Sequence, residues 1–109
     1  MQIFDLAEIE AQCVHGDQRW REFLRALSLS VGVYRLKTGQ LDPQRPHSED
    51  EVYYVVRGKA TFQCGDQKRP VAEGSVIFVE RSVEHRFCDI HEDLTVLVFF
   101  APAEGSLGI

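Results

Sequence analysis

The sequence lacks most features that mark membrane or nucleic-acid-binding proteins. Its longest apolar run, Leu94–Pro102, is about half as long as a membrane-spanning helix and contains Thr95. The chain has only 12 lysines and arginines but 17 aspartates and glutamates, which gives a formal net charge of -5. An acidic chain without a basic cluster is repelled by phosphate backbones. We therefore expect neither a membrane span nor a nucleic-acid partner.

Cysteines and N-terminal targeting features are scarce as well. Cys13, Cys64 and Cys88 are odd in number and form no CxxC pair, which argues against a disulfide scaffold or a cysteine-based zinc site. The first five residues show no basic region followed by an apolar stretch. We expect a cytoplasmic protein with reduced thiols.

What is present predicts one folded domain. The chain has 109 residues, a common domain length, and its seven Phe, three Tyr and one Trp exclude disorder. Residues 4–27 have apolar side chains at mixed helical spacing, and the series Trp20, Phe23, Leu24 and Leu27 predicts a short amphipathic turn or helix. From residue 28 onward the apolar period is two.

This period-two region predicts short antiparallel strands. They are expected over residues 29–34, 51–56, 59–64, 76–79 and 94–100, with breaks that include Gly58 and residues 89–93. The predicted architecture is an all-β sandwich or closed barrel. We divide the chain into an N-terminal helical or extended segment packing on the barrel (1–28), the barrel (29–102) and a tail (103–109) poorly ordered at its end.

Two imidazoles and one carboxylate are candidate metal ligands. His47 and Glu51 are separated by three residues at the start of a strong strand pattern, and His85 ends a loop after another strand. Borderline divalent metals favour imidazole plus carboxylate, and such a set leaves positions open for water or substrate. Taken alone, a histidine beside a strand is more often a hydrogen-bonded polar residue than a ligand.

The residues around these side chains resemble the two motifs of the cupin superfamily. The first motif is represented by His47, Glu51 and Gly58. The second is represented by Gly74, the run Ser75–Val79, His85 and Phe87, with Glu80 and Ser82 where cupins usually have Pro and Gly. The resemblance covers residues 31–101. It implies a double-stranded β-helix, the cupin or jelly-roll barrel, with His47, Glu51 and His85 as metal ligands.

One departure from the first motif bears on the ligand set. The motif normally begins His-x-His, and the first of those positions is Arg45, which cannot ligate a cation. Pro46 breaks the strict strand alternation, so a neighbouring oxygen can replace the missing imidazole. We expect Gln44 as the fourth ligand, ahead of Asp42.

Tyr53 is the candidate catalytic residue. It shares a strand face with Glu51 and Val55, because alternate residues point the same way. A phenol beside a cation has a lowered pKa and can act as ligand or base. The Glu-x-Tyr arrangement also resembles that of cupin lyases acting on dimethylsulfoniopropionate. The alternative is an aromatic that lines the pocket and hydrogen-bonds a water or a carboxylate.

The resemblance implies a metal-dependent enzyme, dioxygenase-like or a lyase or isomerase, acting on a small organic molecule. Its divalent ion would be Fe, Mn, Ni or Zn. A non-catalytic cupin that binds or senses a small ligand is the alternative, since the fold hosts many functions. A structural domain with a degenerate site is disfavoured, because the three metal-ligand candidates His47, Glu51 and His85 are all present.

Surplus apolar positions predict a homodimer. More apolar strand residues are present than one small barrel interior needs: Val31, Val33, Leu94, Val96, Val98 and Phe100. An isologous contact between sheets would cover these faces and the segment over residues 20–27, and would shield edge strands.

Overall fold

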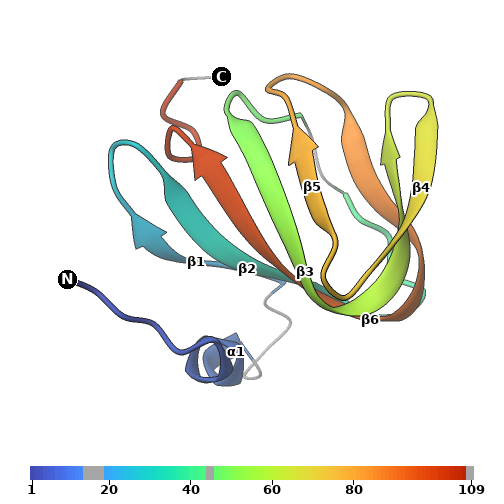
Figure 1. Cartoon of the computed structure of the whole chain (residues 1–109), viewed down its shortest axis with the longest axis horizontal. Coiled ribbons are helices and arrows are strands. Elements are labelled where there is room, and N and C mark those ends of the chain that lie inside the picture. The colour runs from blue at the N-terminus through green and yellow to red at the C-terminus, as the bar shows by residue number, and fades with distance from the viewer. Residues whose placement is uncertain (14–18, 44–45, 108–109) are drawn as a thin grey trace.

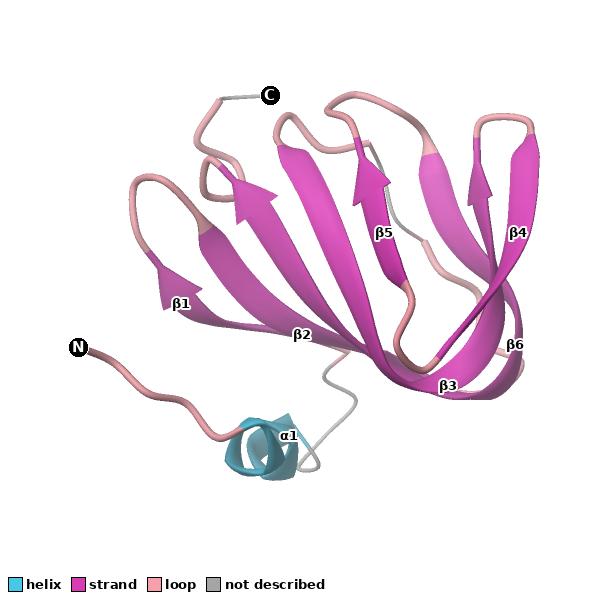
Figure 2. Cartoon of the chain, in the orientation of Figure 1, coloured by secondary structure: helices cyan, strands magenta, loops and turns pink. Residues whose placement is uncertain are grey.

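Alternating apolar and polar side chains place most of the chain after residue 19 in strands (Figures 1 and 2). The computed structural model describes residues 1–13, 19–43 and 46–107. Its elements are α1 (Leu6–Cys13), β1 (Trp20–Arg25), β2 (Ser30–Leu36), β3 (Asp50–Cys64), β4 (Gln67–Ala72), β5 (Val76–Val79) and β6 (His85–Ala101). Among these residues, no helix combines the length and apolarity needed to cross a membrane.

The strands of the described residues form one rolled antiparallel sheet. Its order is β1-β2-β6-β3-β4, and β5 also pairs with β3. Strands β3 and β6 pair from Asp50 opposite Ala101 to Cys64 opposite His85. Strand β5 pairs with residues 51–54 of β3, whereas β4 pairs with residues 59–64, so the two halves of β3 belong to two walls. Figure 1 shows the sheet curling so that these walls enclose an interior.

A glycine lies where both long strands bend. Gly58 has a φ of 104°, and the pairing with β6 is irregular between Val55 and Thr61. A Cβ at Gly58 would lie 2.4 Å from the carbonyl oxygen of Asp93. Only glycine avoids both the backbone strain and this clash. The predicted breaks at Gly58 and residues 89–93 are therefore bends within continuous strands.

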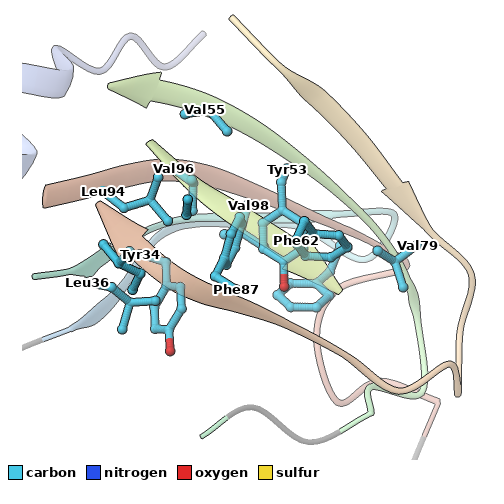
Figure 3. Packing of buried hydrophobic residues seen from close by; sticks show 13 residues of the cluster. Tyr34, Leu36, Tyr53, Val55, Phe62, Val79, Phe87, Leu94, Val96 and Val98 are labelled. Atoms are coloured by element: carbon cyan, nitrogen blue, oxygen red, sulfur yellow. The ribbon is translucent and has the colours of Figure 1, made fainter. Parts of the chain in front are cut away.

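Interior side chains from both walls pack into one core (Figure 3). Tyr53, Phe62 and Phe87 form an edge-to-face group with ring centroids 4.9 to 5.6 Å apart. Glu51, Tyr53 and Val55 are all buried, as the strand period predicted. Truncation of such a core aromatic typically destabilises a protein by about 3–5 kcal/mol. This packing holds the Tyr53 ring rigidly in the interior.

Helix α1 covers the outer face of β2. Ile9 and Cys13 pack on Val33, which is fully buried. At the bend of β3, the Arg57 guanidinium donates hydrogen bonds to the Glu10 carboxylate. These contacts bury an apolar sheet face within the single chain.

The predicted amphipathic turn or helix over residues 20–27 is wrong, because Trp20–Arg25 is strand β1 and pairs with β2. The register shifts between Glu22 and Leu24, which marks a bulge around Phe23. A bulge adds one residue to the strand and offsets its apolar positions. The resulting sequence spacing is similar to that of an amphipathic helix.

The apolar residues expected to form a dimer face are buried within one chain. They are Val31, Val33, Leu94, Val96, Val98 and Phe100. The exposed apolar strand residues are different ones: Tyr54, Val76, Phe78 and Phe99. They occupy strands β3, β5 and β6.

Candidate metal centre

The rolled sheet brings His47, Glu51 and His85 together. His47 precedes β3, Glu51 pairs with Val79 of β5, and His85 begins β6 opposite Cys64 at the far end of β3. One ligand atom from each of the three lies within 4.8 Å of the others. The structure thus gathers the three residues singled out from the sequence.

Two hydrogen-bonded loops fix the approach to this cluster. The Ser82 backbone N–H donates to the His47 carbonyl at 2.7 Å, and the Arg81 N–H donates to Asp50 Oδ1 at 2.9 Å. Ser82 has a φ of 65°, in the left-handed region that favours glycine. This serine therefore adopts the conformation suited to the glycine that cupins usually carry there.

Hydrogen bonding orients the His85 ring. Its Nδ1 lies 2.8 Å from the Val83 carbonyl oxygen, which requires a proton on Nδ1. Its Nε2 lies 3.0 Å from Glu51 Oε1 and 3.1 Å from the Tyr53 hydroxyl. Burial lowers the pKa of His85, but Glu51 and the Val83 carbonyl outweigh it, so the pKa lies above its ordinary value.

Glu51 has the surroundings expected of a cation ligand. Its side chain is 2% exposed, and neither carboxylate oxygen receives a hydrogen bond from the described residues. His85 Nε2 lies 3.0 Å from Glu51 Oε1 and forms an ion pair with it when the imidazole is protonated. A buried carboxylate with no hydrogen bonds is strongly unfavourable, and a divalent cation would compensate for it. The donor set therefore fits a metal of the Fe, Mn, Ni or Zn type.

A small pocket of about 110 Å³ adjoins the cluster. It is lined by Trp20, Tyr34, His47, Glu51, Val98, Phe100 and Glu104. A water molecule takes roughly 30 Å³ in the liquid, so this pocket holds a few waters or a very small ligand. Its walls are mainly apolar, with two carboxylates and one imidazole as polar groups.

Trp20 forms part of the pocket wall. A Cβ on Gly32 would lie 2.2 Å from the indole ring, so the glycine leaves the space that the ring occupies. The indole also meets Phe100 edge-to-face, with ring centroids 6.1 Å apart. Trp20 thus both packs on Phe100 and lines the pocket.

The C-terminal turn contributes a carboxylate that sequence reasoning missed. Glu104 Oε2 lies 3.4 Å from Nδ1 of His47, and Glu104 lines the pocket. Burial raises the pKa of Glu104, and the neighbouring His47 opposes this rise. Glu104 lies in the tail, outside any strand period or motif, so no sequence signal identified it.

The other candidate residues have different positions. Asp42 accepts hydrogen bonds from the Tyr34 hydroxyl at 2.6 Å and the Phe87 N–H at 2.9 Å, and it lies outside the 4.8 Å cluster. Burial, together with the bond to Asp42, raises the pKa of Tyr34, which therefore stays protonated. Tyr53 is fully buried beside His85 and is not among the lining residues of the pocket. Gln44 lies outside the described residues.

The comparisons with known proteins agree with this architecture. The family model of the cupin domain matches residues 32–100. An uncharacterized protein of Streptomyces coelicolor is 46% identical over 104 residues, which are 95% of this chain and 99% of that protein.

Two solved structures are similar in fold. An RmlC-like cupin family protein of Methanocaldococcus jannaschii with a double-stranded β-helix has a TM-score of 0.70 at 19% identity, covering 76% of this chain and 78% of its own. A DMSP lyase of Ruegeria pomeroyi has a TM-score of 0.70 at 21% identity, covering 84% of this chain and 49% of the lyase. The expected double-stranded β-helix is confirmed, and the chain belongs to the cupin superfamily.

Proposed function

We propose that His47, Glu51 and His85 hold one divalent cation, and that the protein is a metal-dependent enzyme acting on a small organic molecule. The observation that carries this proposal is the buried Glu51 carboxylate, which faces His85 without receiving a hydrogen bond. Fe, Mn, Ni or Zn bound there would supply a Lewis acid, and Fe also oxidative chemistry, of the dioxygenase-like, lyase or isomerase kind.

The chain's own residues supply the rest of the proposed site. Trp20 and Phe100 give a ligand an apolar wall and limit its size. The Val83 carbonyl keeps the proton of His85 on Nδ1, which leaves Nε2 as the donor atom. Gln44 remains our proposed fourth ligand.

Tyr53 is proposed to hold a proton at the site. Its hydroxyl is 3.1 Å from His85 Nε2, in a fully buried position. A nearby cation would favour the phenolate form, so this oxygen is suited to accept a proton. Replacing Tyr53 with Phe should reduce turnover and preserve cation affinity, which would separate a catalytic role from a packing role.

Metal analysis tests the proposed site directly. Protein purified without chelator should carry close to one equivalent of a divalent metal, and the double variant His47→Ala, His85→Ala should carry none. The variant His91→Ala is the matched control, because His91 is exposed on β6. Full occupancy in the double variant would refute the site, and a screen of small organic acids with an oxygen electrode then tests for oxidative turnover.

A second candidate function is non-catalytic binding or sensing of a small ligand. The observation in its favour is the mainly apolar pocket, in which Glu104 is, among the described residues, the one charged lining residue outside the metal cluster, so few groups are available for acid–base chemistry. Saturable ligand binding to the metal-loaded protein, with no turnover of any bound compound, would select this function.

We also propose a cytoplasmic homodimer. Phe78 and Phe99 flank Val52 from the two neighbouring strands, so they form an apolar row across β5, β3 and β6. An isologous contact through this face should bury more than about 1,000 Å². Sedimentation should give twice the chain mass for the wild type, and Phe78→Glu should shift it to one chain. The three free thiols suit a reducing compartment.

A further inference from the structure

We propose that Glu104 is a positioning residue for His47: its carboxylate takes the Nδ1–H of the ring and leaves Nε2 to face the cation. This inference rests on the proposed metal site and adds a partner to it from the C-terminal turn. It assigns a role to a residue in the tail that follows β6.

The geometry places Glu104 beside the ligand set without making it a member. Its Oε2 lies 3.4 Å from His47 Nδ1, and both side chains are partly buried in the same pocket. The described cluster with ligand atoms within 4.8 Å comprises His47, Glu51 and His85, and does not include Glu104. A carboxylate next to one ring nitrogen, outside the ligand cluster, is the usual arrangement for orienting a metal-binding imidazole.

His85 shows the same arrangement with a different acceptor. Its Nδ1 faces the Val83 carbonyl oxygen at 2.8 Å, and its Nε2 points to Glu51. Each of the two imidazoles thus has an oxygen at Nδ1. The two histidines would therefore offer the same nitrogen, Nε2, to one cation.

The loop that carries His47 also anchors the turn that carries Glu104. The buried Glu49 carboxylate accepts the Gly105 N–H at 2.8 Å and the Leu107 N–H at 3.0 Å. Because Glu49 lies two residues after His47, the imidazole and its partner are held by one short segment. The hydrogen bonds of Glu49 therefore fix the position of the turn that carries Glu104 relative to His47.

Strands on the other side of the pocket fix the backbone of Glu104. Its N–H donates to Ser30 Oγ at 2.9 Å, and its carbonyl accepts from the Arg25 guanidinium at 2.7 Å. The preceding Ala103 is 2% exposed. A side chain on a backbone held by two hydrogen bonds and next to a buried residue needs little ordering to meet its partner.

Cobalt(II) titration tests the proposal. The affinity of the whole protein for Co²⁺ is measured by competition with a chromophoric chelator, for the wild type, Glu104→Ala, Glu104→Gln and the control Glu92→Gln on the exposed side of β6. We expect Glu104→Ala to bind Co²⁺ about 10- to 100-fold more weakly, with the Co²⁺ absorption spectrum unchanged, because outer partners act through ligand orientation. Glu104→Gln, which keeps an acceptor oxygen, should lose less, and Glu92→Gln should match the wild type.

Each other outcome has a distinct meaning. Equal affinity of Glu104→Ala and the wild type would overturn the positioning role and leave the metal site standing. A changed Co²⁺ spectrum in both Glu104 variants would make Glu104 a direct ligand and also overturn it. If the wild type binds no Co²⁺ or other divalent metal, the proposed function and this inference fail together. Urea denaturation of each variant identifies any loss that comes from unfolding.

Discussion

Two carboxylates at the start of β3 are both buried, yet their surroundings are opposite. Glu49 is 1% exposed, and it accepts hydrogen bonds from the Ser48 hydroxyl and from the N–H groups of Gly105 and Leu107. Glu51 is 2% exposed, and it receives none from the described residues.

The pKa of Glu49 reflects the structural role of that carboxylate. Burial raises the pKa of Glu49, but the bonds from Ser48, Gly105 and Leu107 outweigh it, so the pKa lies below its ordinary value. Glu49 therefore stays ionised as a structural anchor. Glu51 lies two residues further on and lacks such donors, so its charge is available for a cation. Burial alone does not distinguish the two, whereas the number of hydrogen bonds does.

The largest expected effect comes from removing the charge of Glu51. The variant Glu51→Gln should weaken divalent cation binding by more than the roughly 100-fold typical of losing an outer partner, because it removes a ligand. At a pH above the folded pKa of His85, its free energy of unfolding in chelator should not fall, since the imidazole is neutral there and keeps its bond to Val83. Calorimetric titration and urea denaturation measure the two quantities. A large loss of stability in chelator would contradict the comparison.

Glu49→Gln should show the reverse pattern. Loss of the charge that accepts two backbone N–H groups should reduce the free energy of unfolding by about 2 kcal/mol. Cation affinity should fall less than in Glu51→Gln, because the effect reaches the site only through the C-terminal turn. Urea unfolding curves for both variants, measured side by side, provide the test. Equal stability of Glu49→Gln and the wild type would remove the structural role.

The two regions should respond to pH in opposite directions. The folded pKa of Glu49 is lowered, so its stabilisation is complete above the ordinary Glu value of 4.5 and is lost as the pH falls through the folded pKa. The folded pKa of His85 is raised, so in chelator its stabilisation is present below the ordinary value of 6.5 and is lost as the pH rises through the folded pKa. The urea midpoint of Glu49→Gln should depend less on pH than that of the wild type below pH 4.5. The urea midpoint of His85→Ala should depend less on pH than that of the wild type above pH 6.5.

Ser48→Ala should give the smallest effect. It removes one of the three hydrogen-bond donors of Glu49, and the expected loss of stability is about 1 kcal/mol. Both backbone donors remain, so the C-terminal turn should stay in place and cation affinity should change less than twofold. Thermal unfolding and cation titration together check this. A large loss of cation affinity would show that the two backbone N–H donors cannot hold the C-terminal turn on Glu49 without the Ser48 hydroxyl.

The sequence was sufficient for the barrel and for the three clustered residues. Period two predicted the strands, and the spacing of His47, Glu51 and Gly58 carried the resemblance to cupins. The structure gives Gly58 a physical reason, since a side chain there would collide with Asp93. The first motif is informative because it combines a backbone requirement, the glycine at position 58, with the candidate metal ligands His47 and Glu51.

Sequence patterns failed where tertiary contacts decide the outcome. Trp20–Arg25 has helix-like spacing because of a bulge that only its pairing with β2 reveals. Glu104 reaches the pocket because Glu49 and Ser30 bind its segment from distant parts of the chain. Neither relationship leaves a periodic pattern, so neither was predictable from spacing.

The position of β6 has a consequence for how the protein is made. This last strand pairs with both β2 and β3, and Ser30 lies opposite Phe100. Such contacts between distant parts of a chain form slowly, because a long loop must close first. The barrel therefore cannot close before β6 has been synthesised and has left the ribosome. Until then His47 and Glu51 have no His85 to face, and a cation meets the complete ligand set only after β6 has paired with β3.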